Sequence, residues 1–122
     1  MKKVLVIDDE EDVRYIVRMS LGRVAQFTVV EASSGEEGLA LAASEQPDFI
    51  LLDMMMPGMD GVAVFRRLRA APETAAIPVV FLTAKAMASE LRRLTDLGAK
   101  GAVLKPFDPL TLADDITAIL EG

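Results

Sequence analysis

Short apolar runs alternate with helical patterns along the whole chain. Five runs have the length and β-branched composition of strands, and they span residues 3–7, 27–31, 48–52, 77–82 and 101–104. The segment after each run carries apolar residues at spacings of three and four, which is typical of amphipathic helices. The pattern predicts five strand–helix units, (βα)5, in one domain over residues 1–122.

The same spacing predicts which side of each helix is buried. The predicted inward positions are Val13, Ile16, Val17, Leu21 and Val24, then Leu39, Ala42 and Ala43, then Val62, Phe65 and Leu68, then Leu91, Leu94 and Leu97, and finally Leu112, Ile116, Ile119 and Leu120. Helix ends are also marked. Ser34 and Glu37 form a capping box, Gly98 suits the position after a helix, and Asp108 with Pro109 predicts the start of the last helix.

Three of the strand runs, 3–7, 48–52 and 77–82, are apolar almost throughout rather than alternating. Strands have this composition when helices cover both faces of a parallel sheet. Crossovers between parallel strands are right-handed, and 2-1-3-4-5 is a common order for five strands. We therefore predict an α/β fold with a doubly wound five-stranded parallel sheet in that order, the flavodoxin-like arrangement.

Composition and charge narrow the functional classes. No apolar run is long enough to span a bilayer, so we expect a cytoplasmic protein. The chain contains no Cys and no His, which excludes disulfides, thiolate metal sites and the commonest general base. A bound metal would be a hard ion held by oxygen. The net charge of −6 argues against nonspecific nucleic-acid binding, and we expect the arginines at 66, 67, 69, 92 and 93 on solvated helix faces.

Polar residues follow four of the five predicted strands. Asp8 and Asp9 follow the first strand, Asp53 the third, Thr83 the fourth and Lys105 the fifth. The second strand, at an edge in this order, has no such residue. A lone Asp after a strand is usually a turn or cap residue. However, the carboxyl ends of parallel strands share one edge, where α/β folds bind ligands, so these five side chains should meet in one small volume.

That combination of groups indicates a particular chemistry. Three close carboxylates require a cation, and Mg²⁺ (or Mn²⁺) accepts carboxylate, water and phosphate oxygens as ligands. A metal, a hydroxyl and an ammonium around one Asp make a phosphoryl-transfer site, in which a carboxylate can be the nucleophile. Asp53 stands alone beside a loop and is the better nucleophile, while Asp8 and Asp9 are the better metal pair. Residues 10–12 are also acidic, as is typical of a solvated helix start.

This constellation resembles the receiver domain of two-component response regulators. The match covers the whole chain through "VIDDE", "LLDMMMPGMDG", "FLTAK" and "LKPFD", each at the end of a strand. The resemblance implies that Asp53 is the phosphoacceptor and that Asp8, Asp9, Asp53 and the backbone carbonyl of Met55 hold the metal. It further implies Thr83 as the switch hydroxyl, Lys105 as the phosphate-binding lysine and a cis peptide bond before Pro106.

The resemblance also implies partners. A histidine kinase or a phosphotransfer protein would phosphorylate Asp53, and the domain would then change its contacts with a downstream protein. Such a domain catalyses its own phosphorylation and dephosphorylation without being a turnover enzyme. It is expected to be a monomer or a phosphorylation-dependent dimer, with no direct contact to nucleic acid or membrane. The sequence favours a stand-alone receiver, and the alternatives are a receiver cut from a longer regulator and a phosphorelay intermediate.

Two positions bear on how this switch would work. Many family members carry Tyr or Phe three residues before the lysine, where this chain has Ala102, and its one Tyr, Tyr15, falls on the first helix. We therefore expect the signal to pass through the loop after Thr83 and the fourth helix rather than through an aromatic rotamer. Our hypothesis is that Met55 and Lys85 together set a moderately slow autodephosphorylation.

Three other interpretations compete with the receiver. A nucleotide- or flavin-binding module is disfavoured, because no glycine-rich phosphate loop follows the first strand. An aspartate-nucleophile phosphohydrolase is chemically closer, but it would typically need a second Asp at position 55, which is Met. A degenerate receiver that only binds partners would not be phosphorylated.

Overall fold

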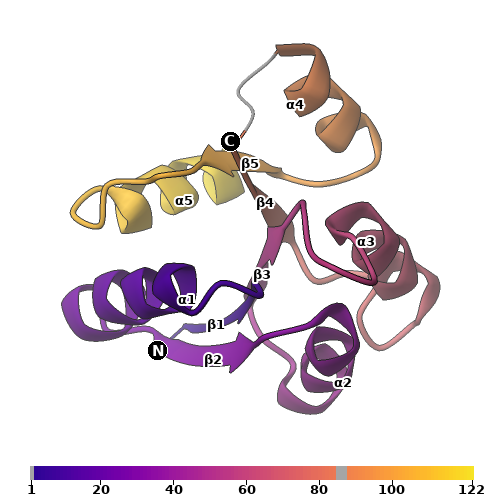
Figure 1. Cartoon of the computed structure of the whole chain (residues 1–122), viewed down its shortest axis with the longest axis horizontal. Helices are drawn as coiled ribbons and strands as arrows, with labels where there is room; N and C mark the ends of the chain where they lie inside the picture. Colours follow the sequence, from indigo (N-terminus) through magenta and orange to yellow (C-terminus); the bar gives the residue numbers. More distant parts are fainter. Residues whose placement is uncertain (1, 85–87) are drawn as a thin grey trace.

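The computed structural model describes residues 2–84 and 88–122. Along the chain its elements are β1 (Lys3–Ile7), α1 (Glu11–Val17), the π-helix η1 (Arg18–Val24), β2 (Thr28–Ala32), α2 (Gly35–Glu45), β3 (Phe49–Asp53), α3 (Gly61–Ala70), β4 (Val79–Thr83), α4 (Ala88–Asp96), β5 (Gly101–Leu104) and α5 (Leu112–Glu121). All strand pairs are parallel, in the order β2-β1-β3-β4-β5 (Figure 1). The predicted fold class and strand order are confirmed.

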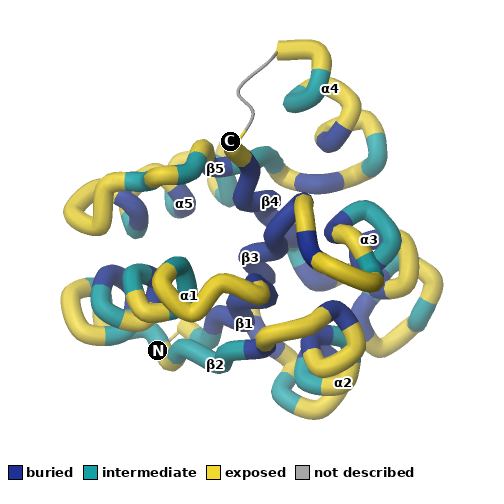
Figure 2. The backbone as a smooth tube through the Cα atoms, viewed as in Figure 1, coloured by how far each residue is buried: buried dark blue, intermediate teal, exposed yellow. Residues whose placement is uncertain are grey.

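Helices cover both faces of the sheet, in two groups (Figure 1). On one face, residues of α1, η1 and α5 share a hydrophobic core with Val4 and Val6 of β1. On the other face, residues of α2, α3 and α4 share a second core with Leu5 and Ile7. Successive residues of a strand point to opposite faces, so a strand between two helical layers needs apolar residues at every position. Every residue of β3 and β4 is buried, which explains the non-alternating runs in the sequence (Figure 2).

The strand ends differ slightly from the prediction, and the difference matters for the site. β1 and β5 have the predicted bounds, β2 and β3 lie one residue later, and β4 runs from Val79 to Thr83. Asp53 and Thr83 are therefore the last residues of their strands rather than the first residues of the following loops. Their backbones are held in the sheet, with Asp53 beside Leu82 and Thr83 beside Leu104.

The first helix ends differently from the prediction. After Val17 the chain continues as the π-helix η1 instead of α-helix. A π-helix has more residues per turn than an α-helix, so an apolar residue at α-helical spacing no longer returns to the same face. Val24 is consequently 69% exposed, and its predicted inward placement was wrong. In α2 the predicted inward placement of Ala43 was also wrong, because Ala43 is exposed. The buried side of this helix is formed by Gly35, Gly38 and Ala42 instead.

The start of the last helix also needs correction. Asp108 does not cap α5, whose first residue is Leu112 and whose cap position is Thr111. The Asp108 carboxylate instead accepts a hydrogen bond from the Leu110 N–H at 2.9 Å, and its carbonyl accepts one from Thr111 N–H. Asp side chains commonly form such turns with the backbone two residues on, so the segment makes a turn before the helix begins.

Two other predicted helix ends are confirmed. The Ser34 hydroxyl accepts a hydrogen bond from Glu37 N–H at 3.2 Å, although the Glu37 carboxylate returns to the N–H of Ser33 rather than that of Ser34. Gly98 follows α4 with φ +111°, and Ala99 N–H donates to the Leu94 carbonyl, as expected for a glycine that ends a helix.

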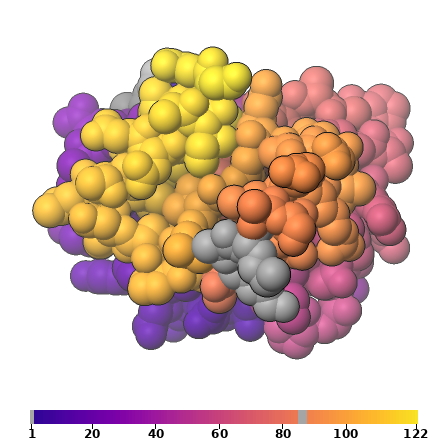
Figure 3. Space-filling model, turned by 90° about the horizontal axis from the view of Figure 1, so that it is seen from above, coloured from indigo at the N-terminus to yellow at the C-terminus, as the bar shows by residue number. Residues whose placement is uncertain are grey.

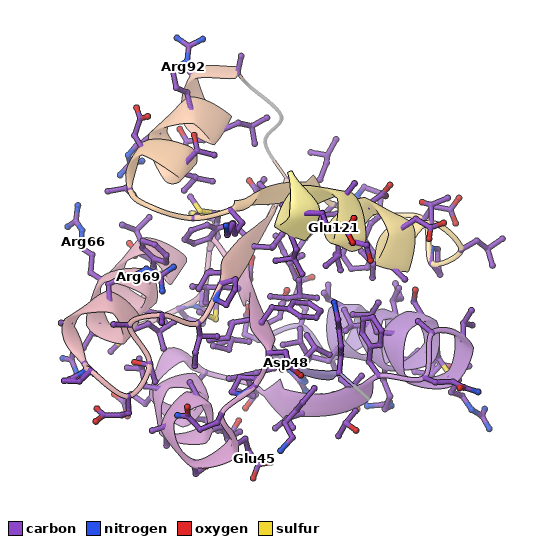
Figure 4. The ribbon with its side chains drawn as sticks, turned by 180° about the vertical axis from the view of Figure 1, so that it is seen from behind. Glu45, Asp48, Arg66, Arg69, Arg92 and Glu121 are labelled. Atoms are coloured by element: carbon purple, nitrogen blue, oxygen red, sulfur yellow. The ribbon has the colours of Figure 1, made fainter. Side chains whose placement is uncertain are left out.

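Of the five arginines predicted on solvated helix faces, those at 66, 67, 92 and 93 are exposed, and Arg69 is the exception. Arg66 and Arg92 project from α3 and α4 away from the sheet (Figure 4), whereas Arg69 lies over the Phe65 ring and donates to the Ile77 carbonyl at 2.9 Å. Figure 3 shows α4 and α5 on one face of the molecule. None of the helices in the described part of the chain is long and apolar enough to cross a membrane.

Candidate functional site

The carboxyl edge of the sheet gathers the polar residues of four strands. Asp8 follows β1, Asp53 and Thr83 end β3 and β4, and Lys105 follows β5. Asp8, Asp53 and Thr83 are buried, unlike nearly all other polar residues in the described parts of the chain. Burial of charged groups is costly unless they are paired, so this edge is where a ligand or an internal counter-ion is required.

Lys105 is that internal counter-ion. Its Nζ lies 2.8 Å from Oδ2 of Asp8, 3.1 Å from Oδ1 of Asp53 and 3.3 Å from Oε1 of Glu10. The backbone also fixes the lysine, because Lys105 N–H donates to the Thr83 carbonyl at 2.7 Å. The peptide bond from Lys105 to Pro106 is cis. One ammonium group thus neutralises part of the charge of three carboxylates.

The three carboxylates form a site that suits a hard cation. One oxygen from each of Asp8, Glu10 and Asp53 lies within 4.8 Å of the others. Oδ2 of Asp8 pairs with Lys105 electrostatically but, like Oδ2 of Asp53, receives no aligned hydrogen bond from the residues that the structure describes. Buried oxygens with unused lone pairs are suitable ligands for Mg²⁺. The donor set therefore fits that ion.

Asp9 and Glu10 are placed differently from the expectation. Asp9 is exposed. Among the described residues, 2–84 and 88–122, the cluster of carboxylate oxygens includes one from Glu10 and none from Asp9. Asp9 lies in a bend between β1 and α1, where the direction of each side chain depends on the loop geometry and not on strand alternation. The acidic run gave no signal that separates these two residues.

Burial and charge determine the pKa values at the site. Burial raises the pKa of Asp53 to about 6, the Lys105 hydrogen bond opposes this rise, and the Asp8 charge adds to it. Burial lowers the pKa of Lys105, but attraction to Asp8 and Asp53 outweighs it and raises that pKa to about 12. At neutral pH Asp53 is mostly ionised and Lys105 is protonated.

The loop after Asp53 is fixed by backbone contacts. Met55 N–H donates to Oδ1 of Asp53 at 3.3 Å, and Gly61 N–H donates to the Met54 carbonyl at 3.0 Å. A Cβ atom on Gly61 would clash with the Asp53 carbonyl oxygen, so only glycine fits there without a backbone shift. The Met55 side chain is 75% exposed, while Met54 and Met56 are buried under the loop.

The residues considered for signalling occupy different surroundings. Ala102 lies beside Phe81 in the sheet register and packs on the core shared with α2, α3 and α4. Tyr15 is half-exposed on α1, where its ring lies 5.4 Å from the Arg18 guanidinium. Lys85 lies outside the described residues.

A doubly wound parallel sheet with carboxylates and a lysine at its carboxyl edge is the architecture of a receiver domain. Residues 4–117 match the family described as "Response regulator receiver domain", and the chain belongs to that family. The resemblance inferred from the motifs is thereby confirmed.

Named relatives and solved structures agree with this assignment. Protein PilH of Pseudomonas aeruginosa is 35% identical over the full length of both chains. The alkaline phosphatase synthesis transcriptional regulatory protein PhoP of Bacillus subtilis is 39% identical over 119 residues, which is 98% of this chain and 48% of PhoP. The chain spans about half the length of such transcriptional regulators. The structure of chemotaxis protein CheY4 of Vibrio cholerae matches with a TM-score of 0.89 and 31% identity, over 98% of each chain.

Proposed function

We propose that Asp53 accepts a phosphoryl group, in a Mg²⁺-dependent reaction, from a phosphohistidine of a kinase or phosphotransfer protein. The observation that carries this proposal is the pairing of a buried carboxylate with Lys105, beside a second buried carboxylate, at the ligand-binding edge of the sheet. A nucleophile needs its lone pairs, and Asp53 keeps one carboxylate oxygen without a hydrogen bond from the described residues.

The transfer is a single displacement at phosphorus. A carboxylate oxygen of Asp53 forms the new O–P bond while the P–N bond to the donor imidazole breaks, and the imidazole nitrogen keeps the electron pair. The Lys105 ammonium then lies beside the phosphoryl oxygens, and Thr83, at the same edge, donates its hydroxyl hydrogen to one of them. Because the pKa of Asp53 is about 6, the ionised nucleophile is the main form at neutral pH.

The metal would be held by the carboxylates of Asp8, Glu10 and Asp53 and by the Met55 carbonyl. Asp9, which the family resemblance implies, is a further proposed ligand. When bound, Mg²⁺ supplies positive charge that stabilises the charge on the transferring group. The protein's own part is to orient these oxygens and to keep Lys105 in place.

The phosphoryl group would act as a switch. Engagement of Thr83 and Lys105 by the new oxygens would draw the loops after β4 and β5 toward Asp53 and shift the population of two conformations. The switched surface would then bind or release a downstream protein. The domain itself would remain a monomer or would dimerise on phosphorylation.

Chemical trapping of the acyl phosphate tests the acceptor. Borohydride reduces an aspartyl phosphate to homoserine, which peptide mapping locates. We expect homoserine at position 53 after treatment with a small phosphodonor and Mg²⁺. Homoserine at position 8 or 9 would contradict the assignment of Asp53. Steady hydrolysis of an added phosphate ester would instead favour a phosphohydrolase.

A further inference from the structure

Arg14 connects the acidic loop after β1 to the edge strand β2. Its Nη1 donates to the carbonyl oxygen of Asp8 at 2.6 Å, and its Nε lies 3.4 Å from Oε1 of Glu31. The Arg14 side chain is only 15% exposed. The other Glu31 oxygen, Oε2, pairs with Arg18 Nη1 at 2.6 Å. Glu31 therefore holds two guanidinium groups that lie one helical turn apart.

These contacts restrain Asp8 from several sides. The Asp8 N–H donates to the Ala32 carbonyl at 3.1 Å, and Oδ1 accepts from the Glu10 N–H at 2.9 Å. The Asp8 carbonyl is held by Arg14, which leaves Oδ2 facing Lys105. A carbonyl that is held on one side fixes the peptide plane after Asp8, and with it the start of the loop that carries Glu10.

We propose that Arg14 and Glu31 are positioning residues for the divalent cation. Glu31 orients the Arg14 guanidinium, and Arg14 holds the Asp8 carbonyl so that the Asp8 and Glu10 oxygens converge. β2 has no polar residue that reaches the site, and Glu31 is its indirect contribution. The inference rests on the proposed function, because it assumes that these oxygens bind a metal.

Charge alone predicts the opposite effect of removing Arg14. A guanidinium close to the acidic cluster repels a divalent cation, so its loss should tighten metal binding if only electrostatics mattered. Loss of a positioning contact should weaken binding, since outer-shell partners of metal ligands typically contribute on the order of 10–100-fold in affinity. The sign of the change therefore separates the two roles.

The test is a titration of the full chain with Mn²⁺ in the absence of a phosphodonor. The electron paramagnetic resonance signal of the free ion measures how much Mn²⁺ remains unbound. We expect Arg14→Gln to weaken binding by about 10–100-fold. Glu31→Gln should weaken it by a smaller factor, and the double variant should bind no more weakly than Arg14→Gln alone, because both act through one contact. Arg18→Gln should change little, because its pair with Glu31 is half-exposed and Arg18 does not contact Asp8 in the structure.

A stability control separates positioning from loss of fold. Thr74 is buried in the connection between α3 and β4, which leads to the amino end of β4 rather than to the carboxyl edge, and its hydroxyl donates to the Leu68 carbonyl at 2.7 Å. Thr74→Val should lower the unfolding temperature without changing Mn²⁺ affinity. Equal weakening in Thr74→Val, or unchanged or tighter binding in folded Arg14→Gln, would overturn the inference. Absence of Mn²⁺ binding in wild type would overturn the metal part of the proposed function as well. Asp8→Asn should lose Mn²⁺ binding if the ion occupies this site.

Discussion

The Lys105 ammonium lies 3.1 Å from Oδ1 of Asp53. The same nitrogen lies 2.8 Å from Oδ2 of Asp8, so one side chain stabilises both buried carboxylates. This pairing makes Lys105 important for stability before any phosphoryl group arrives. The acidic site is thus balanced by an internal cation that a metal can supplement.

Replacing Lys105 should destabilise the metal-free protein. The raised pKa of Lys105, about 12, means that its pairing with the ionised carboxylates contributes fully to stability from neutral pH up to about 10.5 and is lost as the pH rises through about 12. We expect Lys105→Met to lower the free energy of unfolding at pH 7 by on the order of 1–2 kcal/mol in urea denaturation. Saturating Mg²⁺ should reduce the difference, because the ion supplies the missing positive charge.

The exposed Lys100 provides the control for that experiment. Lys100→Met removes the same charge outside the acidic cluster, so it should leave stability nearly unchanged with or without Mg²⁺. If Lys105→Met were as stable as Lys100→Met, the lysine would not be balancing the buried acids.

Replacing Asp53 should have the opposite effect, and the effect should depend on pH. Burial raises the pKa of Asp53 from its usual value near 3.8 to about 6, so the folded protein binds a proton there more readily than the unfolded chain. Stability from this group therefore falls as the pH rises from about 4 to about 6. We expect Asp53→Asn to gain stability over wild type across that window and to remain on the order of 2–3 kcal/mol more stable at pH 7 without metal.

Unfolding curves of both proteins at several pH values measure this difference. A constant difference from pH 4 to pH 7 would mean that Asp53 does not titrate with a raised pKa. Mg²⁺ should stabilise wild type more than Asp53→Asn, since the variant lacks one ligand charge.

The close approach of Gly61 to the Asp53 backbone predicts that a single methyl group there is harmful. Gly61→Ala places Cβ against the Asp53 carbonyl, and we expect a stability loss of about 1–3 kcal/mol. The shift of Asp53 should also slow phosphorylation by on the order of 10–100-fold. Gly22→Ala is the matched control, because its Cβ would meet Val29 at 3.5 Å, an ordinary contact. Equal behaviour of the two variants in thermal unfolding and phosphorylation rate would contradict this reading of the loop.

The exposed Met55 side chain offers a test of phosphoryl lifetime. A thioether provides no strong hydrogen bond to orient an attacking water, whereas an amide does. We expect Met55→Asn to lose its phosphoryl group faster, by on the order of tenfold, or about 1.4 kcal/mol in the barrier. Leu110→Asn is the control, since Leu110 is 82% exposed and lies in the loop before α5. A lifetime equal to that of wild type would remove Met55 from the hypothesis and leave Lys85 to be tested alone.

Much of the fold followed from the sequence because its signals are local. Uninterrupted apolar strands indicated helices on both faces, and the strand order followed from general rules of handedness. The errors lie where local signals compete. An Asp such as Asp108 can either cap a helix or form a turn, and the local sequence fits both. In the structure it forms a turn, and α5 begins at the buried Leu112. Val24 fitted an α-helical period that the chain leaves after Val17.

The candidate site was only partly predictable for a different reason. Residue types at strand ends placed Asp8, Asp53 and Lys105 together, since topology alone brings those ends to one edge. The direction of each side chain depends on loop geometry, so the sequence did not indicate that a carboxylate oxygen of the exposed Glu10 reaches the cluster. Arg14 contacts Asp8 through a backbone carbonyl, and no residue-type pattern marks such a contact.

The most direct measurement is the intact mass of wild type and Asp53→Asn after incubation with a small phosphodonor, with and without Mg²⁺. We predict one added phosphoryl group in wild type, only when Mg²⁺ is present, and none in the variant. Phosphorylation of the variant, or transfer that proceeds equally without the metal, would contradict the proposal that Asp53 accepts the group at a magnesium site.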